Sequence, residues 1–270
     1  MHHRKHQKEL LRSTESTDGV LRLELNDPSR QNALSESMLD SLSGAFDQAG
    51  DNPDVRVIIL ASNGPVFCAG HDLKEMTAGR QNADRGRAYF TKILDQCSSV
   101  MQKIVKSPKP VIVEIDGVAT AAGCQLVASC DLAVASKDAQ FCTPGVHIGL
   151  FCSTPMVALS RNLANKHAME MLLTGDMVPA SRAAKMGLVN QVVPSAELRA
   201  SSMALAKKIA AKSSLTVATG KRAFYQQKEM DLAAAYNYAS KIMVDNMLAR
   251  DAEEGIAAFI EKRAPVWRDE

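Results

Sequence analysis

The stretch VIVEIDGVATAAGCQLVASCDLAVAS, residues 111–136, decides the fold that the sequence predicts. Its first five residues follow the alternating pattern of a strand, and its last five predict a short buried strand. Between the two strands, a turn of small residues leads into a helix that we expect to begin near Ala122. The stretch therefore predicts a strand, a tight turn and a helix whose amino end borders that turn.

The residues before this stretch predict a similar succession. An alternating segment at 21–25 and an apolar run at 55–60 predict two strands, and two prolines end a long helix predicted over 90–104. A helix is predicted between the two strands from apolar residues at helical spacing, which are Met38, Leu42, Phe46 and Ala49. Residues 187–193 predict the last strand. The first two-thirds of the chain therefore predict a mixed α/β core.

The chain after Pro194 is predicted to be wholly helical. No strand pattern remains there, and four segments keep helical spacing: 196–211, 215–226, 232–248 and 252–262. Helices in series need an apolar partner surface, which the core or another subunit would supply. We therefore divide the chain into a disordered basic tail at 1–18, a core at 19–194 and a helical oligomerisation region at 195–270.

Composition excludes several classes of protein. The 270 residues carry a formal net charge of +2 and 46% of them are hydrophobic, so the chain can bury a sizeable core and has no basic surplus for nucleic acid. Gln125 and Asp131 interrupt the weakly polar stretch at 117–136, so we expect no membrane span. The basic start MHHRKHQK is too short and too polar for a signal peptide. We expect a cytoplasmic protein, or one of the mitochondrial matrix if a transit peptide has been removed.

Several kinds of catalytic site find no support in the sequence. No histidine, cysteine or carboxylate cluster has the spacing of metal ligands, and no G-x-S-x-G elbow or glycine-rich nucleotide motif is present. Six cysteines show no C-x-x-C pair, and we expect them to be reduced and buried: Cys68, Cys97, Cys124, Cys130, Cys142 and Cys152. We therefore expect no metal and no nucleotide cofactor.

Two stretches carry small residues where a strand gives way to a helix. The first, GPVFCAGHDLKEM at 64–76, has Ala69 and Gly70 before a helix predicted to begin in DLKEM, and the second is the turn before Ala122. The unpaired N–H groups of two facing helix starts would donate to one oxygen, which is the geometry of an oxyanion hole. An ordinary loop and close helix packing explain the same small residues, and the pattern alone leaves these alternatives open.

A third stretch, FCTPGVHIGLFCSTP at 141–155, is rich in glycine, proline, serine and threonine and predicts a loop with short turns. His147 is the titratable ring within it. A lone histidine among apolar neighbours is more often structural than catalytic, so a structural role is the first interpretation of His147.

Five segments, in this order, resemble the crotonase (enoyl-CoA hydratase/isomerase) superfamily from about Gly19 to the end of the chain, and they are closest to its enoyl-CoA hydratase domain-containing protein 3 group. The segments are DPSRQNALS (27–35), VIILASNGPVFCAGHDLKEM (57–76), KPVIVEIDGVATAAGCQLVASCDLAVAS (109–136), TGDMVPASRAAKMGLVNQVVP (174–194) and EEGIAAFIEKRAPVW (253–267). The resemblance implies an α/β spiral of ββα turns with a C-terminal helical trimerisation region. It also implies a homotrimer or a dimer of trimers, and an acyl-CoA or enoyl-CoA ligand of fatty acid metabolism without a further cofactor.

The resemblance also implies the residues of the ligand site. The backbone N–H groups of His71 and Ala122 would hold the thioester oxygen in an oxyanion hole. The family's CoA-lining positions fall on Ala69, Gly70, Asp72 and Leu73. Phe259 and Lys262 fall where a neighbouring subunit contacts the nucleotide end of CoA.

The chain departs from the family at the two glutamates with which its hydratases add water. These positions carry Gln125 and Gly145. Positioned acid and base groups contribute roughly 10²–10⁴-fold to such a reaction. An amide cannot take up a proton and a glycine has no side chain, so ordinary hydration is expected to be weak or absent.

Three functions remain open on the sequence alone. One is a CoA-thioester enzyme with another base, for which His71 is the first candidate, followed by Asp72, His147, Cys142 and Cys152. Another is a non-catalytic or regulatory acyl-CoA-binding protein, which the loss of both carboxylates favours. The third is a scaffold that assembles through its helical region.

Overall fold

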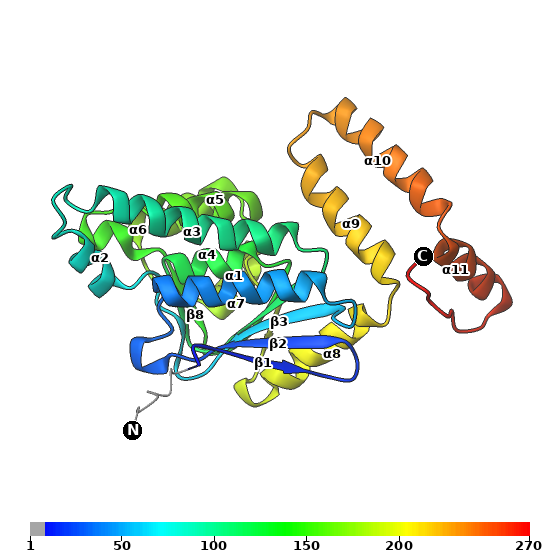
Figure 1. The fold of residues 1–270 in the computed structure, drawn as a ribbon, viewed down its shortest axis with the longest axis horizontal. Coiled ribbons are helices and arrows are strands. Elements are labelled where there is room, and N and C mark those ends of the chain that lie inside the picture. Colours follow the sequence, from blue (N-terminus) through cyan, green and yellow to red (C-terminus); the bar gives the residue numbers. More distant parts are fainter. Residues whose placement is uncertain (1–8) are drawn as a thin grey trace, which may run out of the picture.

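The described strands form two sheets (Figure 1), one of six strands and one of four. The computed structural model describes residues 9–270, in which the sheet orders are β1-β2-β3-β5-β7-β10 and β4-β6-β8-β9. The strands are β1 (Leu11–Glu15), β2 (Val20–Leu25), β3 (Val57–Ser62), β4 (Val66–Cys68), β5 (Val111–Ile115), β6 (Val118–Thr120), β7 (Leu132–Ser136), β8 (Gln140–Cys142), β9 (Val178–Pro179) and β10 (Gln191–Val193).

From β3 to β8, consecutive strands along the chain alternate between the large sheet and the small sheet. β3, β5 and β7 pair in parallel in the large sheet, and the strands that follow them, β4, β6 and β8, pair in parallel in the small sheet. A helix follows each pair of strands before the next turn begins. This repeat confirms the predicted spiral of ββα turns.

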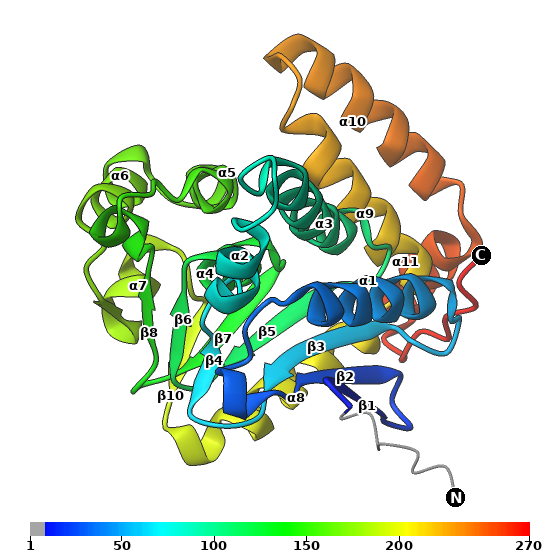
Figure 2. The same cartoon turned by 60° about the vertical axis from the view of Figure 1, so that its left-hand side comes forward.

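Helices cover both faces of the large sheet (Figure 1, Figure 2). α1 and α3 pack together on one face, and α8 packs on the other face against β2, β3, β5 and β7. Parallel strands buried on both faces need apolar residues on both, which explains the continuous apolar run of β3. The helices are α1 (Glu36–Asp51), α2 (Leu73–Gly79), α3 (Arg87–Lys106), α4 (Ala122–Ser129), α5 (Ser153–Asn162), α6 (Asn165–Thr174), α7 (Ala180–Met186), α8 (Leu198–Ala210), α9 (Ser214–Gln227), α10 (Leu232–Met247) and α11 (Arg250–Glu261).

The polar residues of the two alternating strands are partners of one another. Arg22 in β2 donates hydrogen bonds of 2.9 and 2.8 Å to the two carboxylate oxygens of Glu114 in β5, and both residues are buried. Ser202 of α8 also donates to Glu114. A buried charge needs a partner, so Arg22 and Glu114 interrupt the apolar pattern of these strands as an internal ion pair and not as residues of a solvent-exposed face.

Part of the tail expected at 1–18 is a strand. β1 pairs antiparallel with β2, with Leu11 opposite Leu25 and Glu15 opposite Leu21. The sequence LRSTE has no apolar alternation, so backbone pairing with β2 holds this strand and its side chains gave no signal for it. The expected disorder is therefore wrong for β1, while residues 1–8 lie outside the described part of the chain.

Two other segments differ from the prediction. The last strand covers only Gln191–Val193, because Gly187, at φ 92°, ends α7 in the left-handed conformation. The segment 141–155 contains the end of β8, a 3-10 helix at Pro144–Ile148 and the start of α5. The sequence predicted a loop here because each of these elements spans too few residues to show a periodic pattern of apolar side chains.

The helices after α8 leave the sheets (Figure 1). α8 itself belongs to the core, whereas α9 and α10 bury no residue within one chain. Large apolar side chains are exposed on α9, α10, the C-cap of α10 and α11: Phe224, Leu232, Tyr236, Met243, Val244, Met247, Leu248, Ile256, Phe259 and Ile260. A surface of this kind needs a partner, and the expected assembly stays a prediction. Among residues 9–270, no helix has the length and apolar character to cross a membrane.

Candidate functional site

The two predicted small-residue turns lie against one another. β4 and β6 pair in parallel, so the loops that follow them leave the small sheet at the same edge. A Cβ on Gly123 would lie 2.2 Å from the carbonyl oxygen of Cys68, and a Cβ on Gly70 would lie 3.1 Å from the amide nitrogen of Ala122. Only glycine allows these two backbones to approach so closely.

The approach leaves two amides without acceptors. Ala122 is the first residue of α4, so its N–H has no partner within the helix, and α4 has no side-chain cap. In the described residues, neither the N–H of Ala122 nor that of His71 donates a hydrogen bond to the protein. Ala121 holds φ 51° and ψ −118°, a conformation that alanine rarely adopts. Such backbone strain is typical of positions where a site is held in one geometry.

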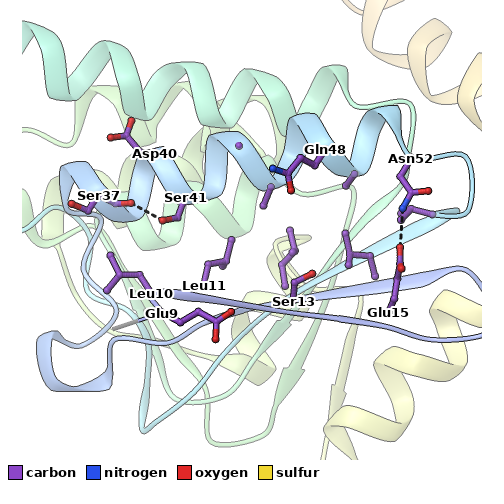
Figure 3. Close-up of a pocket in the computed structure, with 16 residues that line it drawn as sticks. Glu9, Leu10, Leu11, Ser13, Glu15, Ser37, Asp40, Ser41, Gln48 and Asn52 are labelled. Carbon is purple, nitrogen blue, oxygen red and sulfur yellow. Dashed lines mark hydrogen bonds between the residues drawn. The ribbon is translucent and has the colours of Figure 1, made fainter. Parts of the chain in front are cut away.

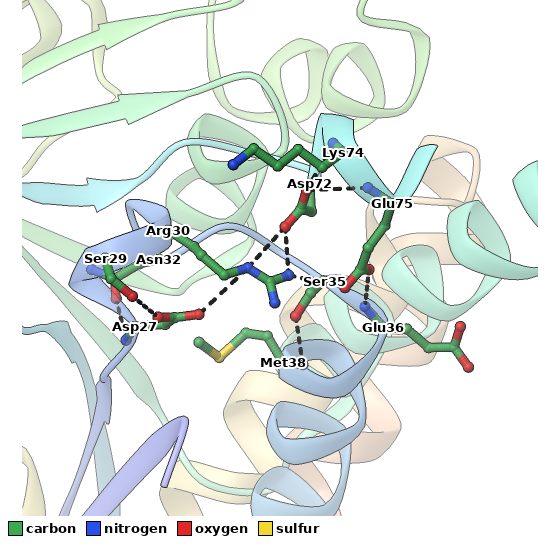
Figure 4. A network of polar contacts seen from close by, with 10 residues as sticks. All are labelled: Asp27, Ser29, Arg30, Asn32, Ser35, Glu36, Met38, Asp72, Lys74 and Glu75. Carbon is green, nitrogen blue, oxygen red and sulfur yellow. Dashed lines mark hydrogen bonds and ion pairs between the residues drawn. The ribbon is translucent and has the colours of Figure 1, made fainter. Parts of the chain in front are cut away.

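Asp72 begins the helix that follows His71 (Figure 4). Its Oδ1 accepts from the N–H groups of Lys74 at 2.8 Å and Glu75 at 3.2 Å, which caps α2. Its Oδ2 accepts from Arg30 at 3.0 and 2.5 Å. The carboxylate expected to line the CoA site is therefore already committed to the protein.

The other residues expected along this loop, Ala69, Gly70 and Leu73, have three different roles in the structure. The N–H of Ala69 donates to the carbonyl of Gln31 at 3.1 Å, so its backbone ties the loop to the segment before α1. Gly70 takes φ +84° at the turn itself. Leu73 is 56% exposed and presents an apolar side chain at the surface.

The positions of the two missing glutamates are both buried. Gln125 lies in the first turn of α4, and its Oε1 has no hydrogen-bond partner. Gly145 lies in the 3-10 helix, where a Cβ would meet the Sγ of Cys152 and the carbonyl oxygen of Leu150, each at 2.9 Å. Among the described residues, the first position therefore holds an amide whose buried oxygen has no partner, and the second has no room for a side chain.

Among the candidate bases, His71 stands apart. Within residues 9–270, both of its ring nitrogens are buried and have no hydrogen-bond partner of normal geometry. Burial lowers the pKa of the ring, and the nearby backbone of Leu34 opposes the shift in part. His71 is therefore neutral at pH 7, and one ring nitrogen has an unused lone pair.

The remaining candidate bases have structural roles or the wrong protonation state. Nε2 of His147 lies 2.8 Å from the carbonyl oxygen of Thr174, which ties the 3-10 helix to the end of α6. Burial raises the pKa of Cys142 to about 11 and also raises that of Cys152, so both remain thiols at neutral pH. All six cysteines are free and buried, as expected from the sequence.

Phe259 and Lys262 lie away from this corner within one chain. Phe259 is 85% exposed on α11, and Lys262 caps that helix with a φ of 56°. In Figure 1, α11 lies at the opposite end of the molecule from α2. A site that contains all the expected residues therefore requires a second chain.

A large groove lies elsewhere, between α1 and the β1–β2 hairpin (Figure 3). It encloses about 1200 Å³ and is lined by none of the expected site residues. Its lining includes three acidic residues, Glu9, Glu15 and Asp40, together with serines and leucines. No signal in the sequence pointed to it. Across residues 9–270, no three histidine, cysteine or carboxylate side chains gather as they would around a metal ion.

Comparison with known proteins agrees with this arrangement. The family model described as Enoyl-CoA hydratase/isomerase matches residues 15–270. Enoyl-CoA hydratase domain-containing protein 3, mitochondrial, of Rattus norvegicus is 49% identical over 257 residues, which are 95% of this chain and 84% of the rat protein. The Homo sapiens protein of the same name is 48% identical over 258 residues, 96% of this chain and 84% of its own length.

Solved structures show the same fold. A crystal structure of enoyl-CoA hydratase from Mycobacterium smegmatis superposes with a TM-score of 0.92 at 48% identity, and it covers 96% of this chain and 99% of that chain. The crystal structure of human enoyl-CoA hydratase domain-containing protein 3 gives a TM-score of 0.90 at 47% identity, with 96% and 100% covered. The group resemblance inferred from the sequence segments is thereby confirmed.

Proposed function

Because this chain belongs to the enoyl-CoA hydratase/isomerase family, we propose that it binds acyl-CoA thioesters without hydrating them at an ordinary rate. The thioester oxygen would accept hydrogen bonds from the N–H groups of His71 and Ala122. Two amides without protein acceptors at one corner of the fold support this placement.

The observation that carries the proposal is the closed position of Gly145. Hydration needs a base for the water and an acid for the α-carbon, and the family supplies both as glutamates. Cys152 and the Leu150 carbonyl leave no space for a side chain at one of these positions, and Gln125 cannot exchange a proton at the other. Each missing group removes up to roughly 10⁴-fold in rate, so hydration is expected to be several orders of magnitude slower than in relatives with both glutamates.

Two measurements test the proposal. Calorimetric titration with butyryl-CoA and with its thioether analogue S-butyl-CoA, which lacks the carbonyl oxygen, is expected to show tighter binding of the thioester. Incubation with crotonyl-CoA followed by mass analysis is expected to show no conversion above the uncatalysed background. Equal affinities would refute the oxyanion placement, and rapid hydration would refute the loss of activity.

A second candidate function is an enzyme that uses His71 as its base. The neutral ring with two unpartnered nitrogens favours it, since a base must have a free lone pair. The same kind of incubation, with a panel of thioesters, separates the two functions. If the parent converts a thioester, loss of that conversion in His71→Asn and its retention in His147→Asn would identify the His71 ring as the base.

We extend the proposal to assembly and location. The exposed apolar side chains of α10 and α11 support a homotrimer or a dimer of trimers, in which Phe259 and Lys262 of one chain would approach the site of another. The names of the rat and human relatives place those proteins in mitochondria, which favours the mitochondrial alternative for this chain over the cytoplasmic one. Light scattering of the purified protein, with a monomer as the contrary result, tests the assembly.

A further inference from the structure

We infer that Arg30 is a positioning residue for the oxyanion donor at His71, an inference that rests on the proposed function. Arg30 is the last residue of the 3-10 helix Pro28–Arg30, which lies ahead of α1. Asp72, which it contacts, lies 42 residues further along the chain. Its guanidinium reaches Oδ2 of Asp72 from both Nε and Nη2, and Nη2 also donates to Oε1 of Glu75 at 2.9 Å (Figure 4).

The donor at His71 belongs to a peptide unit whose orientation is set from the same segment. The carbonyl oxygen of Gly70 accepts from the N–H of Leu34 at 2.7 Å. A trans peptide is planar, so its C=O and N–H groups point in opposite directions. Anchoring the Gly70 carbonyl on Leu34 therefore turns the His71 N–H away from that segment, to where a ligand oxygen can reach it.

Arg30 fixes the other side of this peptide. Asp72 comes directly after His71, and its carboxylate is 9% exposed and shared between the α2 cap and Arg30. The Leu34–Gly70 bond and the Arg30–Asp72 pair thus hold the chain on both sides of His71. A donor held between two anchors keeps its direction without reorganising when a ligand arrives.

The segment that carries Arg30 is itself rigid. Asn32 is fully buried, and its Nδ2 donates to the carbonyls of Asn63 and Val66 at 2.9 and 2.8 Å. Its Oδ1 accepts from the N–H of Asp27 at 2.8 Å. Arg30 is therefore projected from a segment that is bound to the loop between β3 and β4, and its position does not depend on the ligand.

Charge balance makes the guanidinium necessary. Three carboxylates surround it, since Asp27 lies 3.7 Å away in addition to Asp72 and Glu75. Without a cation these carboxylates repel one another, and Asp72 can relieve the repulsion only by moving the start of α2. The Arg30 side chain is 43% exposed, so its replacement leaves no cavity and is expected to change the loop more than the overall stability.

The test compares the thioester preference of variants. The ratio of the dissociation constants of S-butyl-CoA and butyryl-CoA reports the hydrogen bonds to the carbonyl oxygen, because the two ligands differ in little else. We expect a ratio of about ten for the parent protein, because two net hydrogen bonds, from His71 and Ala122, each contribute roughly threefold to an equilibrium. Arg30→Met is expected to lower the ratio to about three, which the Ala122 donor alone would give, with the affinity for S-butyl-CoA changed less than about twofold.

Two further variants separate positioning from a general structural effect. Arg30→Lys keeps the charge but not the paired donors, so an intermediate ratio is expected. Arg182→Met removes a surface arginine that donates to both oxygens of Glu170 at 2.7 Å, and it is expected to keep the parent ratio.

The outcomes distinguish this inference from the proposed function. A parent ratio above three that persists in Arg30→Met overturns the role of Arg30 and leaves the proposed function standing. A parent ratio of one overturns both. If Arg30→Met does not fold, Asp72→Asn replaces it, because asparagine still caps α2 while losing the charge that Arg30 holds. Retention of the parent ratio in Asp72→Asn then refutes the inference.

Discussion

Lys221 of α9 and Asp131, just beyond the end of α4, form an ion pair in which Nζ lies 2.6 Å from Oδ2. Lys221 also donates to the carbonyls of Ile104 and Lys109 at 2.9 and 3.0 Å, and Tyr225 donates to the other oxygen of Asp131 at 2.9 Å. The helices that leave the sheets are thereby joined to the segment that follows the candidate site helix.

Removal of Lys221 is expected to destabilise the protein strongly. Its side chain is only 7% exposed, so Lys221→Met removes the cation from a partly buried carboxylate, which keeps its bonds from Tyr225 and the Val111 N–H. The change also takes this donor away from the Ile104 and Lys109 carbonyls. Breaking such a pair costs about 3 kcal/mol of unfolding free energy. Urea denaturation measures it, with Lys207→Met as the control, because Lys207 pairs with Asp18 at the surface and is expected to contribute less than about 1 kcal/mol. Equal losses of unfolding free energy in the two variants would show that the buried pair stabilises the protein no more than the surface pair does.

Gly145→Ala is expected to lower stability even though it adds a single methyl group. The added carbon would lie 2.9 Å from both the Cys152 Sγ and the Leu150 carbonyl oxygen, and overpacking of this kind costs about 1–3 kcal/mol. Gly44→Ala in α1 is the matched control, because no atom lies within 4 Å of the new methyl and the helix gains about 0.5–1 kcal/mol. A stable Gly145→Ala protein in thermal unfolding would mean that the 3-10 helix can yield, and a glutamate could then be placed there.

Ala121→Gly is expected to keep or raise stability, which is the reverse of the usual effect in or beside a helix. Glycine adopts the φ of 51° and ψ of −118° at this position without the strain that alanine bears, and the gain is up to about 1 kcal/mol. Ala128→Gly, within α4, is expected to lose about 1 kcal/mol because its backbone is helical. Denaturation midpoints of the two variants that shift in the same direction would argue against strain at Ala121.

Acidification is expected to destabilise the folded protein partly through His71. Burial lowers the pKa of the ring below its ordinary value of 6.5, so the unfolded chain takes up a proton at a higher pH than the folded chain does. Unfolding therefore binds a proton in the window between 6.5 and the lower folded pKa, and stability falls as the pH falls through it. His71→Asn should lose less stability than the parent between pH 7.5 and pH 5.5 in urea denaturation. A parent and variant with the same pH dependence would show that the pKa of the ring does not differ between the folded and unfolded states.

Local chemistry explains why much of the fold could be predicted. The apolar runs of β3 and β7 and the helical spacing in α1 and α3 are properties of short segments. Each element formed, with bounds within three residues of those predicted for β3, β7 and α3. The three-residue strands β4, β6 and β8 were missed because a period of two cannot be recognised in so few residues. β1 was missed because pairing with β2, and not its own pattern, makes it a strand.

The same distinction between local pattern and tertiary contact applies to the candidate site. The sequence alone determined which chemical groups exist: small residues at two helix starts, a histidine at one of them, and an amide and a glycine in place of two carboxylates. Only the tertiary structure decided that Gly70 lies against the Ala122 amide, that Gly145 has no space beside it, and that Arg30 holds Asp72 from 42 residues away. The physical reason is range: side-chain chemistry and helical period are local properties, whereas the directions of two amides and the space around a glycine are fixed by backbones that meet only when the parallel strands pair.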